Sequence, residues 1–148
     1  MKQNILVIHG PNLNLLGARE PDVYGSDTLE QINSRLSQFA TQMDFNIEII
    51  QSNSEGQIID ALHKARGKAD GVVINPGAYS HYSLAIYDAV IASALPVVEV
   101  HLSNVFARDQ FRRQLVIAPA CVGVISGLGW RGYIVALETI LNLKKKNP

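Results

Sequence analysis

The apolar residues of this chain follow two alternating patterns. Short runs rich in valine and isoleucine predict buried β-strands, and longer segments with apolar residues at helical spacing predict α-helices. The predicted strands are Ile5–His9, Ile47–Ile50, Gly71–Asn75, Val97–His101 and Val122–Ser126. The predicted helices are one that carries Leu29 to Ala40 with Asp27 as its N-cap, one opened by Ser54, one over residues 81–94, and one over Trp130–Leu143.

Strands that are apolar throughout and are joined by helices are typical of a parallel sheet covered on both faces. With right-handed crossovers, this alternation predicts an α/β fold, a flavodoxin-like three-layer sandwich with a five-stranded parallel sheet in the order 2-1-3-4-5. The length of 148 residues suits one domain over residues 1–148, since domains usually contain about 100–200 residues.

Composition and charge narrow the class of protein. Apolar residues make up 47% of the chain and charged residues 18%, which is typical of a folded chain with a well-filled interior. Thirteen Lys and Arg balance thirteen Asp and Glu, so we expect no nucleic-acid partner and no membrane attachment. We find no apolar segment typical of a membrane span or a signal peptide, and only one cysteine, Cys121, so we expect a cytoplasmic protein without disulfides.

Two connections are longer than the usual strand-to-helix loop of about 2–6 residues. Residues 10–27 contain Arg19 and Tyr24, and residues 102–119 contain several arginines, Arg112 among them. Both connections follow the carboxyl ends of strands, where open α/β sheets bind their ligands. We therefore expect them to be lids or binding segments.

The segment Gly127–Gly132 matches the GxGxxG pattern of dinucleotide-binding turns. No acidic residue lies about 20 positions further on, and no strand follows to complete a βαβ unit. We therefore interpret these glycines as part of a tight turn and of close helix–sheet packing. The sequence also lacks the phosphate-binding and nucleophile-elbow motifs, so we expect no nucleotide cofactor.

Polar residues that could carry chemistry follow the predicted strands. Asn12 comes shortly after the first strand, Asn75 ends the third and His101 ends the fourth. In the predicted strand order these ends are close together, so the three side chains should converge on one crevice with His81 and the arginines. The histidines lack the spacing of a metal site. Proton transfer by His and Tyr remains, with amide and guanidinium groups to bind oxyanions and carboxylates, and it suits elimination or isomerisation next to a carbonyl.

Four stretches of the chain closely resemble type II 3-dehydroquinate dehydratases: His9–Asn14, Leu16–Gly25, Asn75–His81 and Glu99–Asn104. They occur in the same order, and the resemblance extends over the full chain. It implies the anti elimination of water from 3-dehydroquinate to 3-dehydroshikimate through an enolate, in the shikimate pathway of aromatic amino acid biosynthesis. It also implies a flavodoxin-like fold, no cofactor, no Schiff base, and a homododecamer of four trimers.

The resemblance implies a catalytic role for five residues. Tyr24 corresponds to the base that removes a proton from C2, Arg19 to its electrostatic partner, and Asn12 with a water to the group that holds the enolate oxygen. His101 corresponds to the acid that protonates the departing C1 hydroxyl, and Glu99 to the residue that orients it. An ordinary tyrosine has a pKa of about 10, so a base role requires a nearby cation such as Arg19. As alternatives, Tyr24 clamps its loop and Arg19 makes a surface salt bridge.

The resemblance also implies the residues that bind the substrate. They are Asn75 with the backbone of Leu102 and Ser103 for the carboxylate, and His81, Arg112 and, from a neighbouring subunit, Asp88 for the hydroxyl groups. Each group of side chains has an ordinary alternative: the asparagines could cap turns, the arginine could be a surface charge, and the aspartate could be an exposed helix residue.

Some residues beside the motifs depart from the residues common in the family. They are Tyr82, Tyr87, Arg113 and Leu115. Two other functions use the same pocket chemistry: a non-catalytic flavodoxin-like module that binds a small carboxylate, and an isomerase of a related keto acid. The module would not need a tyrosine and an arginine on a long lid, so the residues favour the dehydratase.

Overall fold

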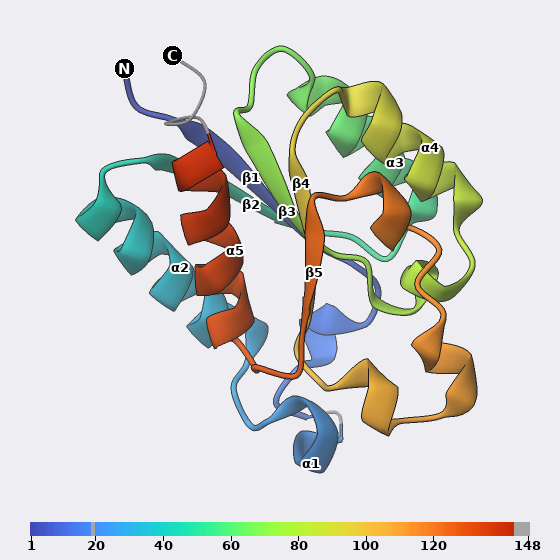
Figure 1. Cartoon of the computed structure of the whole chain (residues 1–148). Coiled ribbons are helices and arrows are strands. Elements are labelled where there is room, and N and C mark those ends of the chain that lie inside the picture. The colour runs from blue at the N-terminus through green and yellow to red at the C-terminus, as the bar shows by residue number, and fades with distance from the viewer. Residues whose placement is uncertain (19, 144–148) are drawn as a thin grey trace.

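The computed structural model describes residues 1–18 and 20–143 (Figure 1). Its strands are β1 (Asn4–His9), β2 (Asn46–Gln51), β3 (Gly71–Asn75), β4 (Val97–His101) and β5 (Gly123–Ser126). All neighbouring pairs are parallel, and the strand order is β2-β1-β3-β4-β5. The predicted α/β fold and its strand order are therefore confirmed.

Four longer helices cover the two faces of the sheet. They are α2 (Leu29–Met43), α3 (Glu55–Ala65), α4 (Leu84–Ser93) and α5 (Arg131–Leu143). Helices α2 and α5 pack on one face, and α3 and α4 pack on the other (Figure 1). Side chains alternate between the faces, so β1 contributes Ile5 and Val7 to the first core and Leu6 and Ile8 to the second. Burial on both faces explains why the strands are apolar throughout.

The two long connections contain short helical turns. Residues 10–27 form a 3₁₀ helix (Leu13–Leu15) and the short helix α1 (Pro21–Tyr24), where only irregular structure was expected. Residues 102–119 form further 3₁₀ turns. A 3₁₀ helix over Gly77–His81 also delays the start of α4 relative to the predicted 81–94. Both connections begin at the carboxyl ends of the strands, at the bottom of Figure 1, and the second then runs back to the start of β5.

The N-cap predicted for α2 is wrong. Thr28, not Asp27, caps the helix: its hydroxyl accepts from the N–H of Gln31 at 3.2 Å, and the Gln31 side chain accepts from the N–H of Thr28 at 2.9 Å. Asp27 instead forms an ion pair with Arg35 at 3.0 Å. Ser54 caps α3 as predicted. Among the described residues, no helix has the length and apolar content to cross a membrane.

The GxGxxG segment serves packing, as interpreted from the sequence. Gly127 and Gly129 adopt the left-handed region, with φ angles of 91° and 60°. Gly132 lies against the sheet, where a Cβ atom would come within 3.2 Å of Ile125 and 3.3 Å of Val100. The glycines therefore form the turn between β5 and α5 and allow α5 to approach the sheet closely.

Candidate active site

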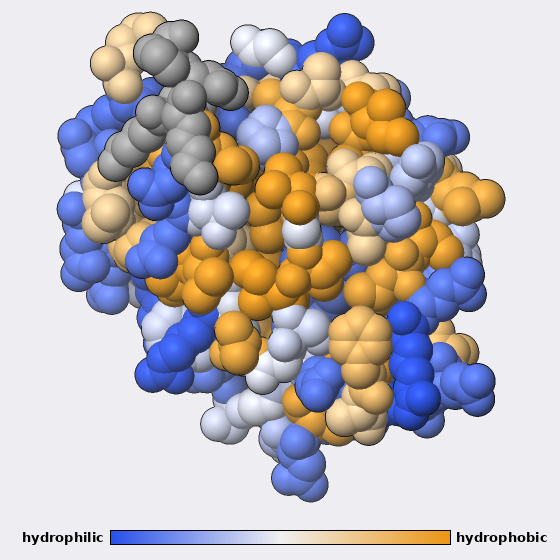
Figure 2. All heavy atoms as spheres, viewed as in Figure 1, coloured by the Kyte–Doolittle hydropathy of each residue, from blue (hydrophilic) through white to orange (hydrophobic). Residues whose placement is uncertain are grey.

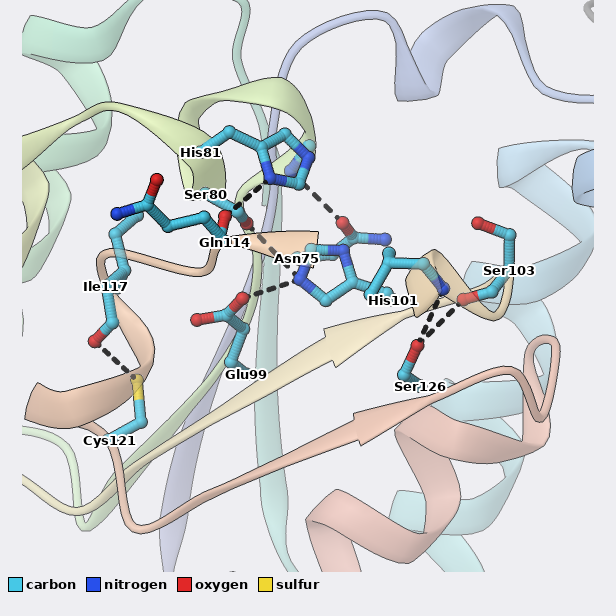
Figure 3. Close-up of polar contacts among 12 residues, drawn as sticks. Asn75, Ser80, His81, Glu99, His101, Ser103, Gln114, Ile117, Cys121 and Ser126 are labelled. Carbon is cyan, nitrogen blue, oxygen red and sulfur yellow. Dashed lines mark hydrogen bonds and ion pairs between the residues drawn. The ribbon is translucent and has the colours of Figure 1, made fainter. Parts of the chain in front are cut away.

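A pocket opens at the carboxyl end of the sheet, between the two long connections. The predicted site residues that line it are Asn12, Tyr24, Asn75, His81, His101, Leu102, Ser103 and Arg112. Figure 3 shows the Asn75 amide and the His101 ring beside one another, with His81 next to them. A larger hollow beside β2 and α3 is lined by none of the predicted site residues. The convergence predicted from the strand ends is thus confirmed.

Two glycines bring the loops after β1 and β3 together. A Cβ atom at Gly10 would lie 2.7 Å from the backbone of Pro76, and the Gly10 N–H donates to the carbonyl oxygen of Asn75 at 2.7 Å. Gly77 has a φ of 59°, and a Cβ there would lie 3.1 Å from the carbonyl oxygen of Pro11. Side chains at these two positions would push the loops apart, so both glycines are needed for the shape of the pocket.

Asn12 occupies a strained turn at the rim of the pocket. Its φ is 68°, in the left-handed region, which asparagine tolerates better than most residues. Its backbone N–H donates to the Asn53 side chain at 3.0 Å, and that side-chain oxygen also accepts from Gln51 at 3.1 Å. These bonds fix a turn that directs Asn12 to the pocket. Asn53 was not among the predicted residues, and no sequence motif indicates it.

The Asn75 amide is buried and held from two sides. Its nitrogen donates to the Tyr133 hydroxyl at 3.1 Å, and its oxygen accepts from the backbone N–H of Gly77 at 3.2 Å. The Tyr133 hydroxyl also lies 2.9 Å from Nδ1 of His9. Burial raises the pKa of Tyr133, so this phenol stays protonated. Because one amide hydrogen is used by Tyr133, the second is left for a ligand.

His101 and Glu99 form a buried pair beneath the pocket. Nε2 of His101 lies 2.5 Å from a carboxylate oxygen of Glu99 and 3.2 Å from the hydroxyl of Ser80 (Figure 3). These contacts occupy Nε2 and leave Nδ1 as the ring nitrogen available to a ligand. Burial and the nearby Glu99 raise the pKa of the Cys121 thiol to about 12, so it is not a nucleophile. Ser80 was not predicted, although it belongs to the motif that includes His81.

His81 and Arg112 also line the pocket. Nδ1 of His81 donates to the backbone carbonyl of Gln114 at 2.9 Å, so Nε2 of the neutral ring is an acceptor that suits a hydroxyl group. The His81 ring is stacked on that of His101, with centroids 6.4 Å apart. Nε of Arg112 lies 3.6 Å from the Asp109 carboxylate.

Tyr24 lies beside an arginine that the sequence did not single out as a site residue. The Arg108 guanidinium is 4.9 Å from the centroid of the Tyr24 ring, and it donates to the Ser103 hydroxyl at 3.4 Å. Arg19, the predicted partner of Tyr24, lies outside the described residues. Arg108 belongs to the second long connection, so the cluster of arginines there was the available signal.

Asp88 does not meet the other predicted residues within one chain. It is exposed on α4 and does not line the pocket. Within residues 1–18 and 20–143, no group of three or more His, Cys, Asp or Glu side chains is close enough to hold a metal ion. The groups that the pocket brings together are therefore those of acid–base chemistry and anion binding.

Comparisons with known proteins agree with this chemistry. Residues 3–141 match the model of the family described as dehydroquinase class II. The chain is 54% identical over 143 residues to a 3-dehydroquinate dehydratase of Bacillus licheniformis, covering 97% of this chain and 99% of that protein. It is 55% identical over 139 residues to a 3-dehydroquinate dehydratase of Clostridium botulinum, covering 94% and 95%. The crystal structure of type II dehydroquinase from Butyrivibrio crossotus has a TM-score of 0.93 at 44% identity, covering 95% of this chain and 98% of that one.

Proposed function

Since this chain belongs to the class II dehydroquinase family, it converts 3-dehydroquinate to 3-dehydroshikimate in the shikimate pathway, and we propose that the pocket at the carboxyl end of the sheet is its active site. The observation that carries the proposal is that Tyr24, Asn12, Asn75 and His101 line this one pocket. Family membership favours dehydration over the carboxylate-binding module and the isomerase that the residues alone left open.

Proton abstraction begins the proposed mechanism. Tyr24, as a phenolate, takes a proton from C2 of the substrate, and the electron pair of the C–H bond moves onto the C3 oxygen to give an enolate. Asn12, through a water, donates a hydrogen bond to that oxygen. The Arg108 guanidinium lies over the Tyr24 ring and places one positive charge beside it, and we propose that Arg19 adds a second.

Loss of water completes the reaction. The enolate pair returns to re-form the C3 carbonyl, the C1–C2 double bond forms, and the C1–O bond breaks as protonated His101 gives its proton to the leaving hydroxyl. The buried Glu99 carboxylate contacts Nε2 of His101 and so orients the ring. At the end Tyr24 is a phenol and His101 a neutral imidazole, so one proton must return to His101 before the next turnover.

Hydrogen-bond donors and acceptors around the pocket account for substrate binding in this proposal. The second Nδ2 hydrogen of Asn75, with the backbone of Leu102 and Ser103, binds the carboxylate. His81 accepts from a substrate hydroxyl through Nε2, and Arg112 donates to another. In each assignment, a donor that remains in the pocket faces an acceptor of the substrate, or a remaining acceptor faces a donor.

We propose that Asp88 reaches the active site of a neighbouring subunit in a homododecamer of four trimers. Helix α4, which carries Asp88, exposes Leu84 and Ile91 at 66% and 55%. Figure 2 shows apolar side chains gathered over the edge strand β5, where Val124 is exposed at 38% and Val122, just before the strand, at 52%. Such apolar surfaces favour contacts between subunits.

The assembly is tested by light scattering, which should give a mass about twelve times that of the 16.2 kDa chain. Mixing an Asp88→Asn variant with a Tyr24→Phe variant, after dissociation and reassembly, should restore part of the activity, because some sites then combine intact residues from two chains. A fully active monomer would contradict the shared site. The cytoplasmic location expected from the sequence is a further proposal, tested by cell fractionation.

The reaction itself is tested by adding 3-dehydroquinate to the purified protein and following the ultraviolet absorbance of the conjugated enone product. Absorbance should rise in the wild-type protein and should be unaffected by a metal chelator or by borohydride, because neither a metal nor a Schiff base takes part. No increase in absorbance would contradict the proposed function.

A further inference from the structure

A buried histidine that the proposed mechanism does not use lies directly behind the pocket. His9 is the last residue of β1 and pairs in register with Asn75, the last residue of β3. Both side chains face the layer of α2 and α5, and the exposures of His9 and Tyr133 are both 0%. The rings of His9 and Tyr133 meet edge to face, with centroids 5.1 Å apart. Together these residues connect the pocket to α2 and α5.

Four hydrogen bonds link these elements in a chain. Asn33 on α2 lies 2.8 Å from Nε2 of His9, and Nδ1 of His9 lies 2.9 Å from the hydroxyl of Tyr133 on α5. The Tyr133 hydroxyl accepts from Nδ2 of Asn75 at 3.1 Å, and Oδ1 of Asn75 accepts from the Gly77 N–H at 3.2 Å. Every partner is fixed by the backbone of a strand, a helix or a tight loop.

Only one arrangement of protons satisfies this chain of bonds. The backbone N–H of Gly77 can only donate, so it requires the oxygen of the Asn75 amide and turns the nitrogen toward Tyr133. The Tyr133 oxygen then accepts from Asn75 and gives its single proton to Nδ1 of His9. His9 must therefore carry its own proton on Nε2 and donate it to the oxygen of Asn33.

The charge state of His9 agrees with this arrangement. Burial lowers the pKa of His9 to about 4, so the ring is neutral near pH 7 and has one donor and one acceptor. The side chains next to it are Asn33, Tyr133, Asn75 and, across the β1–β2 pair, Gln51. Of these four, only Tyr133 titrates, and burial raises its pKa. Among these neighbours in the described part of the chain, no charge therefore competes with the proton order.

We infer that His9 and Tyr133 are positioning residues that hold the Asn75 amide with its nitrogen toward Tyr133, so that Asn75 presents an N–H donor to the substrate carboxylate. The inference rests on the proposed role of Asn75. Had the amide the opposite orientation, Nδ2 would face the Gly77 N–H and an oxygen lone pair would face the carboxylate. The buried chain of hydrogen bonds thus decides whether Asn75 offers the substrate a hydrogen-bond donor or an acceptor.

The test changes which atoms donate in this chain by substituting Asn33, which does not line the pocket. In an Asn33→Asp variant the new carboxylate raises the pKa of His9, so both ring nitrogens become donors as the pH falls toward 6. Tyr133 must then accept from His9, and its proton points at Asn75, which favours the reversed amide. We expect KM for 3-dehydroquinate, relative to wild type, to rise roughly tenfold to a hundredfold between pH 8 and pH 6, the effect of losing a hydrogen bond to a charged group. We expect kcat to change much less.

Two further variants separate the possible causes. Asn33→Ala removes the acceptor but adds no charge, so the proton order at Tyr133 and Asn75 persists and KM should stay within a few-fold of wild type at every pH. Asn75→Ala should raise KM at all pH values. An unchanged KM in Asn75→Ala would contradict the proposed carboxylate site. If KM does rise in Asn75→Ala but Asn33→Asp and Asn33→Ala have equal effects on KM, the positioning role is overturned.

A spectroscopic measurement on the wild-type protein does not depend on activity or on any variant folding. Nitrogen-15 NMR of the histidine rings reports which nitrogen carries the proton. The structure requires His9 to be neutral with its proton on Nε2 at pH 7. A proton on Nδ1, or a charged ring at that pH, would overturn the inference even if the enzyme is fully active.

Discussion

Acid should unfold this protein in part through one residue, His9. An unfolded histidine has a pKa of about 6.5, whereas burial lowers the folded-state value to about 4. As the pH falls from 6.5 to 4, the unfolded chain therefore binds a proton that the folded chain excludes. The contribution of His9 to the free energy of unfolding is therefore complete above pH 6.5 and is lost as the pH falls to 4. A difference of about 2.5 pKa units corresponds to roughly 3 kcal/mol per chain.

A His9→Gln variant isolates this contribution, because glutamine keeps a polar side chain but cannot titrate. Urea unfolding of both proteins should be measured between pH 7.5 and pH 4 at one fixed protein concentration, since subunit association also affects stability. The variant should be less stable at pH 7.5, where two hydrogen bonds are altered. Between pH 7.5 and pH 4, however, the wild-type protein should lose roughly 3 kcal/mol more than the variant does. Parallel stability curves would refute the assignment to His9.

Two other substitutions test the loop approach and the acid pair. Gly10→Ala should lower the free energy of unfolding, measured by chemical denaturation, by about 1–3 kcal/mol, because its Cβ would meet the Pro76 backbone at 2.7 Å. The control Gly56→Ala should change it by less than about 1 kcal/mol, because the Cβ there would meet only a side-chain atom at 3.8 Å. Glu99→Gln should lower kcat about tenfold or more in the enone assay, because the charge that faces His101 is lost; an unchanged kcat would show that the pair is structural.

The strands could be predicted from the sequence because burial on both faces makes them continuous runs of apolar residues. The boundaries of β3 and β4 were predicted to the residue, and those of the others within one residue. Helix caps depend on finer contacts. Asp27 and Thr28 are both suitable N-caps with a partner three residues later. In the structure Thr28 caps the helix, and Asp27 forms an ion pair with Arg35 further along α2.

From the sequence, only the site residues at the ends of strands could be predicted to lie together. Asn75 and His101 end adjacent strands, so the strand order alone brings them together. Arg108 was missed because its place over Tyr24 depends on how two irregular connections fold against each other. Tyr133 was missed as a partner of Asn75 because their contact arises from the packing of α5 on the sheet, which no local sequence pattern records.

The most direct test of the mechanism is the turnover of a Tyr24→Phe variant on 3-dehydroquinate, which removes one oxygen from a side chain that lines the pocket. A matched control is Tyr82→Phe, which removes the same atom from a side chain 63% exposed outside the pocket. If Tyr24 is the base, kcat falls by about two to four orders of magnitude, the usual contribution of a positioned general base, while KM and the control stay near wild type. Near-normal turnover by Tyr24→Phe would contradict the account.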